Sequence, residues 1–155
     1  MTNEEKKELL RSSLEYGTCK KEIIFDCVFC LSILFIFGII ALLTESALFL
    51  LAAVPAFVIY IPMAFVEAGR MREILEKGAD MELYEGRLTE PKPYFGGAAY
   101  FSVIIYSPDG NNFTLETRAI AAMRGGLKPH YTELDGKRVS VACNRESGEV
   151  IVIRV

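Results

Sequence analysis

Residues 23–66 read IIFDCVFCLSILFIFGIIALLTESALFLLAAVPAFVIYIPMAFV, and this stretch decides the fold. Asp26 and Glu45 are its only formally charged residues. The runs 23–43 and 47–66 each hold about 20 residues, so each predicts a helix of roughly 30 Å, which matches the hydrocarbon core of a bilayer. Because only three residues separate the runs, the two helices must be antiparallel neighbours. The sequence therefore predicts a transmembrane helical hairpin.

The basic residues around the hairpin predict its orientation. They occur before the first run and after the second, and the turn has none: Lys6, Lys7, Arg11, Lys20, Lys21, Arg70, Arg72 and Lys77. Since Lys and Arg are enriched in cytoplasmic loops, we expect a multi-pass protein of the plasma membrane with both termini in the cytoplasm. A cleaved signal peptide fits less well, because the apolar run is too long and no small-x-small cleavage pattern follows it.

Shorter helices are expected on both sides of the hairpin. Residues 1–22 predict a cytoplasmic amphipathic helix over 3–16 that ends before Gly17. After the second run, residues 67–78 should continue the helix. This extension would hold the rest of the chain close to the bilayer.

From residue 79 the hydrophobic period changes to two, which indicates β-strands. The expected strands are 82–89, 99–107, 113–118, 137–144 and 149–155. A helical turn is expected at 119–124. An antiparallel sheet of this size usually closes into a barrel, because closure removes exposed edges. The predicted fold class is a membrane α + β protein, in which a small antiparallel β-barrel of about five strands (79–155) follows the hairpin.

Four short motifs in this C-terminal part carry a resemblance to a known type of protein. They are a G-x-L strand, a Y-S-x-D-G turn, a G-K-x-V-x-V strand and a valine-rich last strand, at Gly86–Leu88, Tyr106–Gly110, Gly136–Val141 and Val150–Val155. With them the chain resembles small bacterial membrane proteins of the NfeD-like type, which join a two-helix anchor to a cytoplasmic OB-like or SH3-like barrel. The chain differs from part of that group in placing both spans before the barrel. The resemblance implies a role in membrane protein assembly or quality control and brings no catalytic residues.

Polar residues at the start of the first apolar run have several possible roles. Cys27 and Cys30 lie one helical turn apart, but a redox C-x-x-C normally begins a helix in a βαβ unit. Packing is therefore favoured over redox sensing, metal binding or lipid attachment. An acid inside a span usually finds a partner or reaches the interface. For Asp26 the options are a salt bridge with Arg70 that locks the hairpin, solvation at the interface, and an ion or proton role.

The C-terminal part offers little chemistry. His130 is the only histidine, so one chain can assemble neither a His-based metal cluster nor a Ser-His-Asp triad. A possible anion-binding loop, with an ordinary solvated loop as the alternative, contains Arg124, Gly125, Gly126, Lys128 and His130. No catalytic residue, metal ligand or cofactor is predicted.

Charge and organisation together predict the class of function. The 17 basic and 20 acidic residues create no single-sign field, so no nucleic-acid partner is expected. The favoured function is a membrane-anchored interaction or scaffold protein, which presents the barrel to a membrane protein partner or forms a homo-oligomer. The alternative is a ligand-gated, oligomerising membrane effector whose barrel senses a small anionic molecule. A membrane enzyme would need polar groups such as Asp26, Glu67 and Arg70 to converge.

Overall fold

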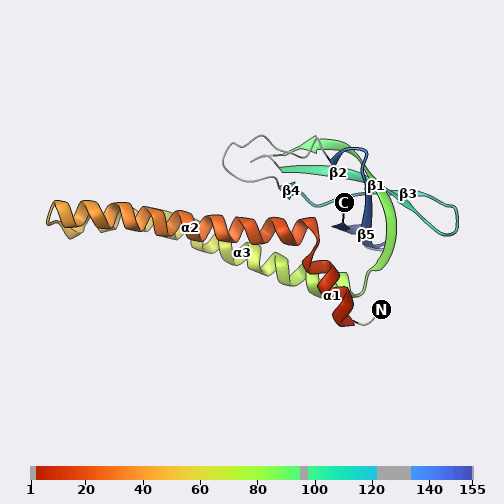
Figure 1. Cartoon of the computed structure of the whole chain (residues 1–155), viewed down its shortest axis with the longest axis horizontal. Helices are drawn as coiled ribbons and strands as arrows, with labels where there is room; N and C mark the ends of the chain where they lie inside the picture. The colour runs from red at the N-terminus through yellow and green to blue at the C-terminus, as the bar shows by residue number, and fades with distance from the viewer. Residues whose placement is uncertain (1–2, 95–97, 122–133, 155) are drawn as a thin grey trace.

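The computed structural model describes residues 3–94, 98–121 and 134–154. The helices come first: α1 (Asn3–Arg11), α2 (Leu14–Leu43), the 3₁₀-helix η1 (Ala47–Ala53) and α3 (Val54–Ala79). The strands follow: β1 (Glu82–Pro93), β2 (Ala98–Tyr106), β3 (Phe113–Glu116), β4 (Ile120–Ala121), β5 (Arg138–Asn144) and β6 (Glu149–Arg154). Figure 1 shows α2 and α3 side by side as a long rod, with the sheet at the end where α2 begins and α3 ends.

The two long helical segments are apolar on their outside. Leu14–Leu43 and Ala47–Ala79 are both long and apolar enough to cross a membrane. In their most apolar windows only 11% and 6% of the residues are buried, so these side chains do not form a protein core. Pro55 lies in the first turn of α3, where its missing N–H costs nothing, and Pro62 lies inside the helix.

The N-terminal helix is shorter than the sequence predicts. α1 ends at Arg11, and Ser13 caps a new helix, because its extended backbone lets its hydroxyl accept the N–H of Tyr16 at 3.1 Å. Gly17 therefore lies inside α2 and ends no helix. The break lets α1 pack across α3, where Lys6 donates to the Ala79 carbonyl at 3.0 Å. This contact binds a cation to the C-terminal end of α3, where the helix dipole favours one.

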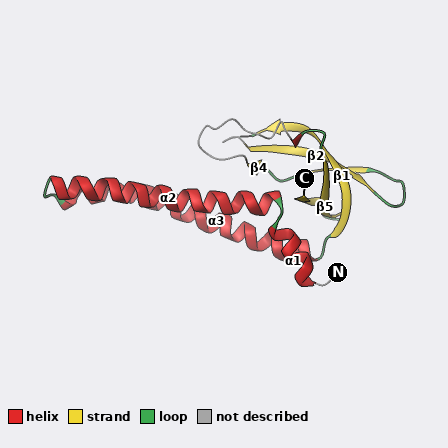
Figure 2. Ribbon diagram, in the orientation of Figure 1, coloured by secondary structure: helices red, strands yellow, loops and turns green. Residues whose placement is uncertain are grey.

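The strands form one antiparallel sheet in the order β3-β2-β1-β5-β6, and β4 adds to the start of β2 (Figure 2). β1 is long enough to pair with β5 through 82–87 and with β2 through 85–93. Its register shifts between Thr89 and Lys92, where Glu90 has a positive φ of 51°. Such an irregularity bends a strand, and the sheet curls into a half-barrel.

The last strand, β6, is buried on both faces. Val150 and Val152 point into the half-barrel, while Ile151 and Ile153 pack against the helices. The helix-facing core also contains Leu10, Cys19, Ile74, Met81 and Ala142. This double burial explains why residues 150–153 are all apolar instead of alternating with polar residues.

Two sequence predictions about the sheet need correction. The sheet is a half-barrel and not a closed barrel, because β3 and β6 end the hydrogen-bonded path of described strands. The predicted helical turn is also wrong at Ile120–Ala121, which is strand β4. Ile120 pairs with Ala99 and is buried in the core inside the half-barrel, which we call the inner core. That burial favours an extended conformation. Residues 122–124 lie outside the described part of the chain.

Candidate functional site

The most distinctive site is the place where the start of α2 meets the open side of the half-barrel. We call the gap between β6 and β4 the seam. α2 contacts both strands, and Leu14 packs against the inner core of the sheet. A helix that begins before the first apolar run therefore covers the two free edges of the sheet.

Glu15 makes the central contact of the seam. Only 4% of this residue is exposed, and its two carboxylate oxygens accept the Val152 N–H at 2.9 and 3.1 Å. The carboxylate thus takes the place of a neighbouring strand's carbonyl at the edge of β6. Burial raises the pKa of Glu15 to about 7, although the hydrogen bond from Val152 and the charge of Arg118 oppose the rise.

An ion-pair network links α3 to the sheet beside the seam. Arg118 contacts Glu73 at 3.0 Å and Glu149 at 3.2 Å, and Lys77 contacts the same two carboxylates at 2.9 Å each. Hydrogen bonds from Arg118 and Lys77 lower the pKa of Glu73 to about 2. Because all four groups are partly exposed, water screens these pairs, and they orient the sheet more than they stabilise it.

A third polar cluster joins the two long helices near the sheet. Glu67 is buried in α3 and binds Arg70 at 2.6 Å. From α2, the buried Cys19 reaches Glu67, and its pKa rises to about 12, first through burial and then through this hydrogen bond. A thiol with so high a pKa is a poor nucleophile. The predicted pairing of Arg70 with Asp26 stays a prediction.

The residues singled out at the start of the apolar run differ in their surroundings. Asp26 is buried, Cys27 is exposed, and the Cys30 thiol lies 3.9 Å from the Ala56 carbonyl of α3. All four cysteines of the chain are free, so Cys27 and Cys30 form no disulfide. The roles considered for Asp26 stay predictions.

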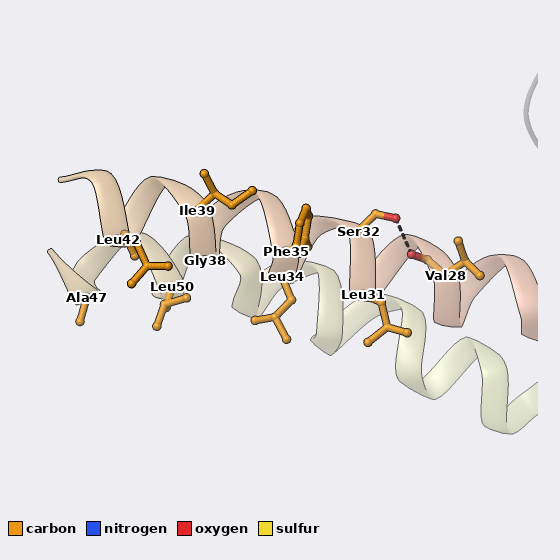
Figure 3. A pocket seen from close by; sticks show the side chains of 11 residues that line it. Val28, Leu31, Ser32, Leu34, Phe35, Gly38, Ile39, Leu42, Ala47 and Leu50 are labelled. Atoms are coloured by element: carbon orange, nitrogen blue, oxygen red, sulfur yellow. Dashed lines mark hydrogen bonds between the residues drawn. The ribbon is translucent and has the colours of Figure 1, made fainter. Parts of the chain in front are cut away.

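Two open apolar grooves follow the outside of the helices. One, of about 980 Å³, runs along α2 from Val28 to Leu42 and includes Leu50 beyond the turn, and Figure 3 shows the mostly apolar side chains that line it. Ser32, which lines this groove, donates its hydroxyl hydrogen bond to the Val28 carbonyl at 2.8 Å. The second groove, of about 490 Å³, lies between α2 and α3 beside Cys27. Both grooves are mostly apolar and suit hydrocarbon, and Asp26, Cys27 and Cys30 are among the residues that line the second.

Two further sequence predictions concern anion binding and metal binding. The possible anion-binding loop, Arg124, Gly125, Gly126, Lys128 and His130, lies outside them. Within residues 3–94, 98–121 and 134–154, no group of three or more His, Cys, Asp or Glu is placed to hold a metal ion.

Comparison with known proteins does not assign the chain to a family. No protein-family model, no curated protein and no solved structure matches the chain. The resemblance to NfeD-like proteins therefore stays a prediction, and a function must be inferred from the junction, the helix surface and the sheet.

Sequence reasoning missed the seam. Glu15 lies among other charged residues of the N-terminal segment, and no local pattern sets it apart. Its burial depends on Val152, 137 residues further along the chain. The all-apolar run at 150–153 was the available signal, since it implies that something covers both faces of β6.

Proposed function

We propose that the chain is a membrane-anchored interaction or scaffold protein. Residues 23–43 and 47–66 cross the plasma membrane as a hairpin, and both termini lie in the cytoplasm. The sheet is held at the cytoplasmic face for a membrane protein partner or a second copy of the chain. The junction carries this proposal, because the seam, the helix-facing core and the ion-pair network fix the sheet to the hairpin in one orientation.

The surface of the helices supports insertion of the hairpin. Phe35, Leu42, Leu43 and Phe65 are 69–81% exposed. A soluble monomer rarely exposes continuous apolar surface of this extent, whereas lipid would cover it without cost. Charged residues resume just outside 23–66 on both sides.

The interior of the half-barrel supports an interaction role over ligand sensing. Leu88, Phe101, Val103, Ile105 and Val152 are all fully buried there. A sensor of a small anion would need a cavity with converging polar groups in this place. The ligand-gated effector is therefore the less supported proposal.

The outer face of β1 and β2 is the surface we assign to the partner. Leu83 and Tyr106 are exposed on it, and Glu85 lies opposite Tyr106 in the strand register. Arg87 continues the same face of β1. Exposed aromatic and aliphatic side chains beside charged ones are typical of protein interfaces.

Photo-cross-linking in native membranes tests this proposal. A photoreactive residue at Tyr106 or Leu83 should give the same protein adduct, identified by mass spectrometry. The same residue at Glu8, which is exposed on α1, should not give that adduct. If neither sheet position captures a protein, and the purified chain carries a small anionic metabolite, the interaction proposal is wrong and the effector is favoured.

A further inference from the structure

Two tyrosines at one end of the sheet have no role in its core. Tyr94 directly follows β1 and is 56% exposed. Its ring meets that of Tyr100 on β2 edge to face, with 5.1 Å between the centroids. The neighbouring Lys92 is paired with Glu116 at 2.7 Å. This end of the sheet therefore presents an aromatic pair that belongs to neither hydrophobic core.

The same end of the sheet lies beside α2. Pro93 pairs with Ala99, and Ala98 pairs with Ala121 of β4, the strand that contacts α2. Figure 1 shows this end of β1 and β2 on the side of the sheet to which the rod of α2 and α3 extends, whereas the turn between β2 and β3 lies on the opposite side. The aromatic pair is thus on the side of the sheet nearest the apolar run.

Along α2, the seam lies close to the start of the predicted membrane span. Glu15, which holds β6, precedes Ile23 by eight residues, or about 12 Å along a helix. The headgroup layer occupies roughly 5–7 Å of that distance on each side of the hydrocarbon. An end of the sheet that extends about 5–7 Å beyond Glu15 in the direction of the rod would reach this layer.

We propose that Tyr94 and Tyr100 insert into the headgroup layer of the cytoplasmic leaflet, so that the sheet rests on the bilayer. Tyrosine suits this zone because its ring is apolar and its hydroxyl can bind water or a headgroup. The inference rests on the proposed function, since it requires an inserted hairpin. It adds a lipid contact made by the sheet domain itself, which leaves the Tyr106 end free for a protein.

A single tryptophan can report this contact, because the chain has none. The full chain carrying Tyr94→Trp is reconstituted in phosphatidylcholine vesicles, with nitroxide quenchers at the lipid headgroup or deep in the acyl chain. We expect headgroup-labelled lipid to quench Tyr94→Trp about twofold or more over Tyr106→Trp, the matched control at the other end of β2. Aqueous iodide should quench Tyr106→Trp more strongly than Tyr94→Trp.

A third variant separates failure of this inference from failure of the proposed function. Phe35→Trp, at an exposed position of α2, should be quenched by the deep acyl label if the hairpin is inserted. If the deep label quenches Phe35→Trp, but the headgroup label quenches Tyr94→Trp and Tyr106→Trp equally, the lipid contact alone is overturned. No deep quenching of Phe35→Trp would overturn both. Tyr100→Trp gives the same readout if Tyr94→Trp fails to fold.

Discussion

At the edge of β6, the Glu15 carboxylate accepts the N–H that a neighbouring strand would otherwise bind. A buried carboxylate is costly when it is ionised. Here the hydrogen bond from Val152 and the charge of Arg118 offset only part of that cost, since the pKa of Glu15 still rises from 4.5 to about 7. The attachment of helix to sheet should therefore depend on pH near neutrality.

The stability of the folded chain should decrease as the pH rises from about 4.5 to about 7. The folded state prefers the protonated carboxyl, so this contribution is fully present below 4.5 and is lost as the pH passes the folded-state pKa. The difference corresponds to about 3 kcal/mol. Glu15→Gln keeps an acceptor for Val152 without a charge. It should show no such decrease and should be more stable than the wild type at about pH 8.

Urea unfolding in detergent micelles, followed by the near-ultraviolet circular dichroism of the tyrosines, measures this dependence. Glu8→Gln, at an exposed acid of α1, is the matched control and should follow the wild type. A wild-type midpoint that stays constant from about pH 5 to about pH 8 would contradict the role given to Glu15.

Single residues show why part of the site could be predicted and part could not. Asp26 stands out because it interrupts an apolar run, and the structure buries it. Glu15 has no such contrast with its neighbours. Its surroundings come from a strand at the other end of the chain, and no local periodicity contains that information.

At the level of elements, the sequence predicts what local periodicity controls. The long helices follow from apolar runs, four of the strands follow from alternation, and β6 follows from a short apolar run, with ends within a few residues of those observed. Closure of the sheet was predicted wrongly, because the element that fills the seam is a helix. Strand alternation cannot show that α2 supplies this cover.

The packing of α1 on α3 should be sensitive to one glycine. A Cβ on Gly78 would lie 2.6 Å from a methyl carbon of Leu10, which is itself buried in the helix-facing core. Because that core leaves Leu10 little room to move, Gly78→Ala should destabilise the fold by about 1–3 kcal/mol. Urea unfolding, as above, provides the measurement.

Gly69→Ala is the matched control in the same helix. A Cβ there meets nothing within 4 Å, so alanine should leave stability unchanged or raise it by about 0.5–1 kcal/mol. Equal effects of the two substitutions would show that the Leu10 contact does not determine the packing.

At the scale of the whole molecule, the helices and the sheet share a hydrophobic core, so we expect them to fold as one unit. The helices cover the outer face of β5 and β6, and α2 fills the seam. A fragment of residues 80–155 would expose both surfaces to water. It should therefore lack cooperative unfolding and aggregate, as judged by urea titration and size-exclusion chromatography. A fragment that unfolds cooperatively as a monomer would show that the sheet does not need the hairpin.

The orientation of the hairpin determines where the sheet is presented. Ser46 lies in the turn between α2 and η1, at the far end of the rod from the sheet. Glu85 is exposed on β1. The proposed function requires these two positions to lie on opposite sides of the plasma membrane.

Labelling with a membrane-impermeant thiol reagent tests this central claim most directly. Ser46→Cys and Glu85→Cys are each placed in a background without the four native cysteines. The account predicts that Ser46→Cys reacts in intact cells and that Glu85→Cys reacts only after the cells are broken. Reaction of both positions in intact cells, or of Ser46→Cys only in broken cells, would contradict a hairpin that holds its sheet at the cytoplasmic face.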